Sequence, residues 1–221
     1  MMNVKILPSL LAADFGRLAE EIKRAEASLA DAIHLDIMDP HFVPNISFGP
    51  DVVALSKKTA PGFYRNVHLM MDRPDLYIGK FADAGAETIQ IHIEADCDLH
   101  DTLASIRRIG LRNALVLNPE TPIETFLPYL GEIDEALVMT VHPGYGGQKF
   151  IEECLPKVEW LRKRVPNLDI MVDGGINGET AVRAAAAGAN MLVAGSYLFS
   201  KRDMALAVSQ MRASCADGGR P

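Results

Sequence analysis

Ile33-His34-Leu35-Asp36-Ile37-Met38-Asp39 places a histidine and a carboxylate two positions apart inside an otherwise apolar run. Side chains two positions apart on a β-strand point to the same side, so His34 and Asp36 should share one face. Two further apolar runs each have one potential metal ligand toward their end, His68 and Asp173. The sequence therefore predicts four potential metal ligands at the ends of three strands.

Short β-branched or aliphatic runs of this kind alternate with amphipathic segments along the whole chain. The predicted strands cover residues 4–8, 32–37, 65–69, 88–92, 113–117, 135–141, 169–173 and 190–194, and helix-like segments between them include 15–28, 74–84, 99–109, 151–164 and 180–187. Gly85 and Gly188 each precede a predicted strand and should end a helix in a left-handed turn. No linker-like tract interrupts the pattern. The eightfold β-then-α alternation predicts an α/β fold, a single (β/α)8 TIM barrel domain over residues 1–221.

Composition limits the possible partners. The 221 residues are 48% hydrophobic and include 22 basic and 29 acidic residues, giving a net charge of −7. An acidic chain is a poor ligand for nucleic acid or an anionic membrane, so neither is expected as a partner. No apolar run reaches the roughly 20 residues that span a bilayer, and the first residues lack a secretory pattern. We expect a soluble, cytoplasmic protein with free thiols at Cys97, Cys154 and Cys215.

In a (β/α)8 barrel the catalytic residues lie at the carboxyl ends of the strands. His34, Asp36, His68 and Asp173 all fall at or near such ends. Two imidazoles and two carboxylates form a mixed nitrogen and oxygen ligand set, which suits one borderline divalent cation: Zn, Fe(II), Mn or Co. The ligand types leave the identity of the metal open.

Glycine-rich turns follow the last three predicted strands. They are His142-Pro143-Gly144-Tyr145-Gly146-Gly147-Gln148, Asp173-Gly174-Gly175 and Ala194-Gly195-Ser196. Glycine lets backbone N–H groups approach an anion closely, and barrels frequently bind phosphate in the loops after strands seven and eight. One isolated Gly-Gly pair is ordinary turn chemistry, but three successive strand ends predict a phosphorylated ligand.

From about Ile6 to Arg212 the chain resembles the ribulose-phosphate 3-epimerase family. The matching motifs, in family order, are Pro8-Ser9-Leu10-Leu11-Ala12-Ala13-Asp14-Phe15, His34 to Asp39, Phe42-Val43-Pro44-Asn45, Val67-His68-Leu69-Met70, Pro143 to Gln148, Val172-Asp173-Gly174-Gly175 and Ala194-Gly195-Ser196. The resemblance implies a barrel of the ribulose-phosphate-binding type. It also implies a metal-dependent isomerase that interconverts D-ribulose 5-phosphate and D-xylulose 5-phosphate in the pentose phosphate pathway.

The resemblance also implies residue roles. His34, Asp36, His68 and Asp173 would hold one divalent metal, and Asp36 and Asp173 would be the catalytic acid/base pair. The substrate would be contacted by Ser9, His68, Met38, Met70 and Met139, and its phosphate by Gly144, Tyr145, Gly146, Gly147, Gly174, Gly175, Gly195 and Ser196. Family membership further implies a homo-oligomer, either a dimer or a hexamer.

Two carboxylates on different strands fit such chemistry on general grounds. Inverting a carbon beside a ketone requires removal of a proton from one face and delivery to the other, through a planar enediolate. Aspartates on the second and seventh strands can approach a central substrate from different sides. A metal near the ketone oxygen would stabilise the developing negative charge.

Several alternatives stay open at this level. The closest is an epimerase for D-allulose 6-phosphate or a related ketose phosphate, and a more distant one is a sugar-phosphate-binding barrel without activity. A barrel aldolase or decarboxylase should carry a lysine at a strand end, and no predicted strand ends in one. Pro40 and His142 depart from the family pattern. Glu94 either supports a nearby ligand or is a solvated loop carboxylate, and nothing in the spacing of His92 demands chemistry.

Overall fold

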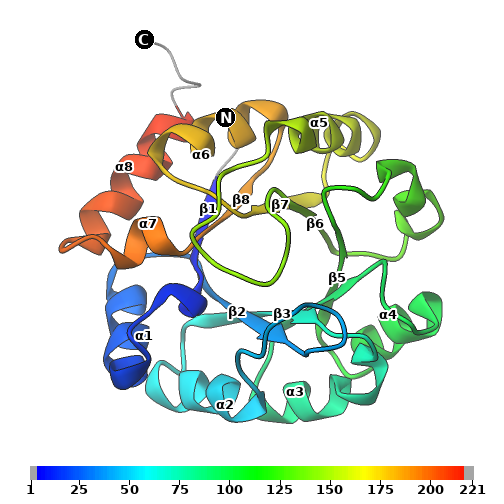
Figure 1. Ribbon diagram of the computed structural model, residues 1–221, viewed down its shortest axis with the longest axis horizontal. Helices are drawn as coiled ribbons and strands as arrows, with labels where there is room; N and C mark the ends of the chain where they lie inside the picture. The colour runs from blue at the N-terminus through cyan, green and yellow to red at the C-terminus, as the bar shows by residue number, and fades with distance from the viewer. Residues whose placement is uncertain (1–3, 217–221) are drawn as a thin grey trace.

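The computed structural model describes residues 4–216 and shows a ring of helices around a central parallel sheet (Figure 1). The strands are β1 (Lys5–Pro8), β2 (Ala32–Met38), β3 (Tyr64–Met70), β4 (Thr88–His92), β5 (Arg112–Leu117), β6 (Glu135–Met139), β7 (Asp169–Asp173) and β8 (Met191–Ala194). The α-helices are α1 (Leu18–Ala27), α2 (Pro50–Thr59), α3 (Ile78–Ala84), α4 (Leu99–Arg108), α5 (Leu155–Arg164), α6 (Gly178–Ala187), α7 (Ser196–Phe199) and α8 (Met204–Ala216). The predicted domain range also includes residues 1–3 and 217–221, which lie outside the described residues.

The sheet is eight-stranded and parallel, with the strand order β1-β8-β7-β6-β5-β4-β3-β2. Its two ends meet at a parallel bridge between Ser9 and His34, just beyond β1 and within β2. The Asp31 backbone N–H also donates to the Ile6 carbonyl, which adds to this contact. The predicted (β/α)8 TIM barrel is therefore confirmed.

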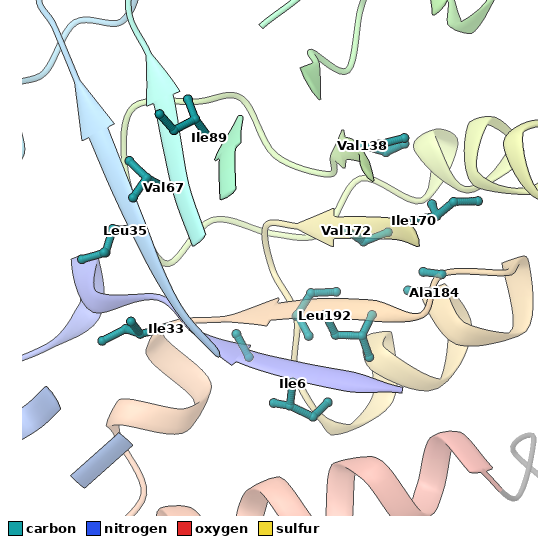
Figure 2. Close-up of a cluster of buried hydrophobic side chains, with 14 of the residues drawn as sticks. Ile6, Ile33, Leu35, Val67, Ile89, Val138, Ile170, Val172, Ala184 and Leu192 are labelled. Atoms are coloured by element: carbon teal, nitrogen blue, oxygen red, sulfur yellow. The ribbon is translucent and has the colours of Figure 1, made fainter. Parts of the chain in front are cut away.

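Side chains along each strand point alternately outward and inward, and they form two separate apolar layers. Outward-facing residues such as Ile33, Leu35 and Val67 belong to the large core between the strands and the helices, part of which is drawn in Figure 2 together with Ala184 of α6. A smaller core fills the barrel interior and includes Leu7, Leu137, Met171 and Val193. Because the side-chain period is two, the even-numbered residues of β2 and β3 point inward, and this orientation carries His34, Asp36 and His68 to the barrel axis.

Helix ends follow local chemistry. α6 begins with a capping box in which the Asn177 side chain accepts from the Thr180 backbone N–H and the Thr180 hydroxyl accepts from the Asn177 backbone N–H. Gly85 and Gly188, predicted to end helices, have φ values of 106° and 114° and close α3 and α6 in the left-handed conformation. Both glycine predictions are confirmed.

The boundaries of several predicted elements differ from those observed. A 3-10 helix, Ile123–Tyr129, lies between β5 and β6 with Pro128 inside it, where an α-helix would lose a hydrogen bond. The segments predicted at 15–28, 74–84 and 151–164 begin with 3-10 turns at Phe15–Arg17, Pro74–Leu76 and Glu152–Cys154. β6 ends at Met139, two residues early, and the hydroxyl of the next residue, Thr140, donates to the carbonyl oxygens of Asp173 and Gly174.

Helices long and apolar enough to cross a membrane are absent from residues 4–216.

Candidate active site

Four side chains converge at the carboxyl ends of β2, β3 and β7. Their potential ligand atoms, from His34, Asp36, His68 and Asp173, all lie within 4.8 Å of one another. The Asp36 Oδ1 atom is 3.2 Å from His34 Nε2 and 3.1 Å from His68 Nδ1. The Asp173 Oδ2 atom is 3.6 Å from His34 Nε2 and 3.9 Å from His68 Nδ1. Residues far apart in sequence thus form one compact cluster.

The donor set of this cluster fits a divalent cation. Among residues 4–216, His34 Nε2 is buried without a hydrogen-bond partner, although it faces both carboxylates. A buried polar atom of this kind usually has a partner, and a cation would provide one. Two imidazole nitrogens and two carboxylate oxygens suit Zn, Mn, Fe(II) or Co. The cluster could therefore hold a metal, whose identity the donor set leaves open.

The two carboxylates have opposite electrostatic environments. Burial and the nearby charge of Asp36 raise the pKa of Asp173 to about 7. Burial also disfavours ionised Asp36, but the charge of His34 and the hydrogen bond from His68 hold its pKa well below the usual value. Such a pair can contain one readily ionised and one readily protonated carboxyl, which is the arrangement that acid/base catalysis requires.

The two histidines also differ from each other. Burial alone would lower the pKa of His34, but Asp36 and Asp173 raise it to about 9. Burial lowers the pKa of His68 to about 4, and the hydrogen bond to Asp36 only partly opposes this effect. His34 and His68 are fully buried, so their protonation depends on neighbouring side chains rather than on solvent.

Buried polar side chains contact the outer nitrogen of each imidazole. His34 Nδ1 lies 2.8 Å from Asn66 Oδ1, and the Asn66 amide donates to Glu135. His68 Nε2 lies 2.8 Å from His92 Nε2, and His92 Nδ1 lies 3.0 Å from Glu94 Oε2. Sequence reasoning assigned no role to Asn66 or His92, although Asn66 has the inward parity of His68 on the same strand, β3.

A cavity of about 230 Å³ opens directly above the cluster. Asp36 and Asp173 contribute to its floor, whereas His34 and His68 lie buried beneath it. Its lining includes the other residues predicted to bind substrate: Ser9, Met38, Met70, Met139, Gly144, Tyr145, Gly146, Gly147, Gly174, Gly175, Gly195 and Ser196. These residues therefore line one cavity. Their contacts with substrate stay a prediction.

Polar and apolar groups occupy different parts of this cavity. The Ser9 hydroxyl donates to Asp36 Oδ2 at 2.5 Å, which places it beside the cluster. Met38, Met70 and Met139 are at most 5% exposed and bring thioether groups to the cavity lining. Lysine and arginine are absent from the lining among the described residues. An anion in this cavity would therefore be held by neutral donors: backbone N–H groups, hydroxyls and side-chain amides.

Two lining glycines occupy positions where a side chain does not fit. Gly174 and Gly175 have φ values of 116° and 66°. A Cβ atom at Gly174 would lie 2.5 Å from Val141 Cγ2, and one at Gly175 would lie 2.6 Å from the Phe150 backbone nitrogen. The loop after β7 therefore requires glycine twice, for conformation and for close backbone approach.

The loop after β6 lies across the centre of the barrel in Figure 1 and is tied to the loop after β2. The Tyr145 hydroxyl donates to the Pro44 carbonyl at 2.8 Å, and the Asn45 amide donates to the Gly144 carbonyl at 2.7 Å. These two contacts hold the glycine-rich segment over the cavity.

The two departures from the family pattern are both exposed residues. His142 pairs with Glu120 at 2.8 Å, and both side chains are exposed. Pro40 is exposed in a turn whose N–H groups at His41 and Phe42 donate to the Asp39 carboxylate. Neither Pro40 nor His142 belongs to the described cavity lining.

Fold and site together define a (β/α)8-barrel enzyme with a centre that could hold a metal. Similarity to a solved structure supports the fold: 3-hexulose-6-phosphate synthase from Salmonella typhimurium matches with a TM-score of 0.73 and 18% identity, over 97% of this chain and 100% of that chain. At this low identity the match concerns the architecture alone.

Sequence comparison narrows the class to a family. The family model for the ribulose-phosphate 3 epimerase family matches residues 5–199. Ribulose-phosphate 3-epimerase from Bacillus subtilis (strain 168) is 44% identical over 216 residues, covering 96% of this chain and 99% of the relative. The cytoplasmic isoform from Oryza sativa subsp. japonica is 42% identical over 214 residues, covering 95% and 93%. The chain belongs to the ribulose-phosphate 3-epimerase family, as the sequence motifs indicated.

Proposed function

We propose that the protein is a metal-dependent 3-epimerase that interconverts D-ribulose 5-phosphate and D-xylulose 5-phosphate by two-base proton transfer through an enediolate. One observation carries the proposal: Asp36 and Asp173 reach the same cavity floor from β2 and β7, strands that are not neighbours, and their pKa values are shifted in opposite directions. Family membership supports the same reaction.

The two aspartates perform the proton transfers. One carboxylate removes the proton from carbon 3 on one face, and the other carboxylic acid returns a proton on the opposite face. The reverse reaction exchanges their roles. Ser9 donates to Asp36 Oδ2, so it orients one of the two groups and leaves Oδ1 directed toward the histidines.

His34, Asp36, His68 and Asp173 would hold one divalent cation, which would act as a Lewis acid and stabilise negative charge on the enediolate oxygens. The buried Met38, Met70 and Met139 side chains exclude water from the reacting carbons.

The phosphate would occupy the end of the cavity formed by the loops after β6, β7 and β8. Gly174, Gly175, Gly195 and Ser196 line that end, and α7 begins at Ser196. The first turn of a helix leaves N–H groups without intrahelical partners, so these groups can bind phosphate oxygens. Binding the phosphate there would fix the position of carbon 3 relative to both aspartates.

Deuterium exchange tests this function directly. Protein loaded with a divalent metal is incubated with ribulose 5-phosphate in deuterated water, and NMR follows deuterium at carbon 3 together with xylulose 5-phosphate. Label in the product is the expected result, and no exchange across Zn, Mn, Fe(II) and Co would contradict the proposal. A parallel reaction with allulose 6-phosphate identifies the preferred chain length.

The proposal also covers the domain range, the assembly and the cellular location of the protein. We propose one barrel domain over residues 1–221, assembly as a homodimer or homohexamer, and a cytoplasmic location, the last in line with the Oryza relative named as a cytoplasmic isoform. Light scattering coupled to size exclusion would measure the number of subunits, and any number other than two or six would contradict the proposed assembly.

A further inference from the structure

A line of hydrogen-bonding side chains leads away from the candidate metal centre toward the loop after β5. It begins at His68, passes through His92 at the end of β4 and ends at Glu94. The imidazoles of His68 and His92 are nearly parallel, with an interplanar angle of 20° and ring centroids 5.0 Å apart. Both rings are fully buried. None of the proton-transfer steps above uses His92 or Glu94.

The protons in this line can be placed by counting donors. An ionised carboxylate only accepts, so His92 Nδ1 must carry the proton that it shares with Glu94 Oε2 at 3.0 Å. Neutral His92 then has a bare Nε2, which must accept from His68 Nε2–H across 2.8 Å. Asp36 Oδ1 and His68 Nδ1, 3.1 Å apart, would both be ligands of a bound cation, so neutral His68 would then direct the lone pair of Nδ1 to the cation instead of donating a proton to Asp36.

Glu94 is itself held in place. Its Oε1 atom accepts from the Asn118 backbone N–H at 2.9 Å and from the Thr121 hydroxyl. Lys157 Nζ of α5 donates to the carbonyl oxygens of Asn118, Pro119 and Thr121, which fixes the same loop from its other side. Because both Glu94 oxygens accept, the carboxylate cannot turn without losing partners.

The ring of His92 is also confined sterically. Phe42, from the loop after β2, packs against it with ring centroids 4.7 Å apart. His92 therefore lies between an aromatic ring and His68 and has little freedom to flip. Hydrogen bonding and packing select the same orientation.

We propose that His92 and Glu94 are positioning residues for the metal centre: together they fix the His68 tautomer that presents Nδ1 to the cation. This inference rests on the metal site of the proposed function. Partners that orient a metal-binding histidine commonly change metal affinity 10–100-fold when removed, on the order of the effect expected here.

Two substitutions at His92 separate positioning from packing. His92→Phe keeps a ring between Phe42 and His68 but removes the acceptor, so we expect the dissociation constant for Zn(II) to rise roughly 10–100-fold. His92→Gln restores an acceptor, its amide oxygen, and should recover most of the affinity. If His92 only filled space, His92→Phe would bind Zn(II) more tightly than His92→Gln. His100→Phe is the matched control, because His100 forms an exposed pair with Glu132 at 2.9 Å.

Chelator competition gives the Zn(II) affinities of the four proteins, and histidine ¹⁵N NMR of the zinc-loaded parent reports its tautomers. We expect the His92 proton on Nδ1, weak binding only in His92→Phe, and parental affinity in His100→Phe. A His92 proton on Nε2, or parental affinity in His92→Phe, would overturn the inference. A parent that binds zinc with His92 protonated on Nδ1 but exchanges no deuterium at carbon 3 would instead count against the proposed reaction.

Discussion

The Asn66 side chain accepts a hydrogen bond from His34: its Oδ1 atom lies 2.8 Å from His34 Nδ1. The direction is set by Glu135, because the Asn66 amide nitrogen donates to Glu135 Oε2 at 3.2 Å and so turns its oxygen toward the imidazole. With a cation bound, neutral His34 would therefore keep its proton on Nδ1 and direct the lone pair of Nε2 to the side of Asp36 and Asp173. Two buried side chains of the barrel interior, Asn66 and Glu135, thus orient the candidate ligand His34.

Asn66→Leu should weaken metal binding by roughly 10–100-fold, because leucine has the same branching and number of side-chain heavy atoms but no acceptor to hold the His34 tautomer. Zn(II) affinity measured by chelator competition checks this. Asn167→Leu, at an exposed position, is the control. Equal affinities in the two variants would show that Asn66 does not orient His34.

Asp36→Asn and Asp173→Asn should each reduce epimerisation by at least about 10²–10⁴-fold, the usual contribution of a positioned acid or base. Because each variant keeps one of the two groups, each should still exchange the carbon 3 proton of only one epimer with deuterated water. Asp83→Asn, exposed on α3, should behave like the parent. Exchange of both epimers by either site variant would contradict the two-base assignment.

Removal of divalent metal with a chelator should abolish turnover and lower the thermal unfolding midpoint. A cation that binds only the folded state adds about 2.7 kcal/mol at 100 times its dissociation constant. Two carboxylates held close together, one buried and one half-buried, make this barrel particularly dependent on a compensating charge. Calorimetry with and without added Zn(II) or Mn(II) measures the difference, and an unchanged midpoint would argue that the cluster holds no cation.

Gly175→Ala should destabilise the protein by about 1–3 kcal/mol, because its backbone is left-handed and a Cβ atom would meet the Phe150 backbone. If the loop binds phosphate, KM for the sugar phosphate should also rise. Urea unfolding and steady-state kinetics measure the two effects. Gly62→Ala, where a Cβ atom meets nothing within 4 Å, is the control and should change neither quantity.

Asp169→Asn should lower the free energy of unfolding by about 1–3 kcal/mol at neutral pH. The Asp169 carboxylate, at the start of β7, accepts hydrogen bonds from Lys5, Arg112 and Asn190. Burial opposes ionisation, but the Asn190 and Lys5 hydrogen bonds and the charges of Lys5 and Arg112 lower the pKa of Asp169 below its ordinary 3.8. Folding with a lowered carboxyl pKa adds stability above pH 3.8, and this stability is lost as the pH falls through the lower folded-state value.

Urea unfolding of the parent and Asp169→Asn at several pH values tests that sign. The difference between the two proteins should be full at pH 7 and should shrink below pH 3.8. A difference that grew on acidification would contradict the assigned direction of the shift.

Much of the architecture could be predicted from sequence because its signals are local. Apolar runs of the right length located the strands, with β4 and β7 matching the predicted ranges at both ends. Left-handed glycines marked the ends of α3 and α6. The 3-10 helix Ile123–Tyr129 and the early end of β6 were not predicted: the first contains Pro128, and beside the second the Thr140 hydroxyl donates to Asp173 and Gly174, residues far away in the sequence.

The candidate site also has one part that could be predicted from sequence and one part that could not. Sequence by itself determined which residue types stand at the strand ends, since the period of two places His34 and Asp36 on one face and family motifs assign the remaining ligands. Only the tertiary structure decided that His92 touches His68 and that Asn66 touches His34. Those contacts depend on strand register, with His68 opposite Gln90 and His34 opposite Asn66, and on closure of the barrel. Register and closure arise from packing of the whole sheet against its helices, so no single stretch of sequence contains them.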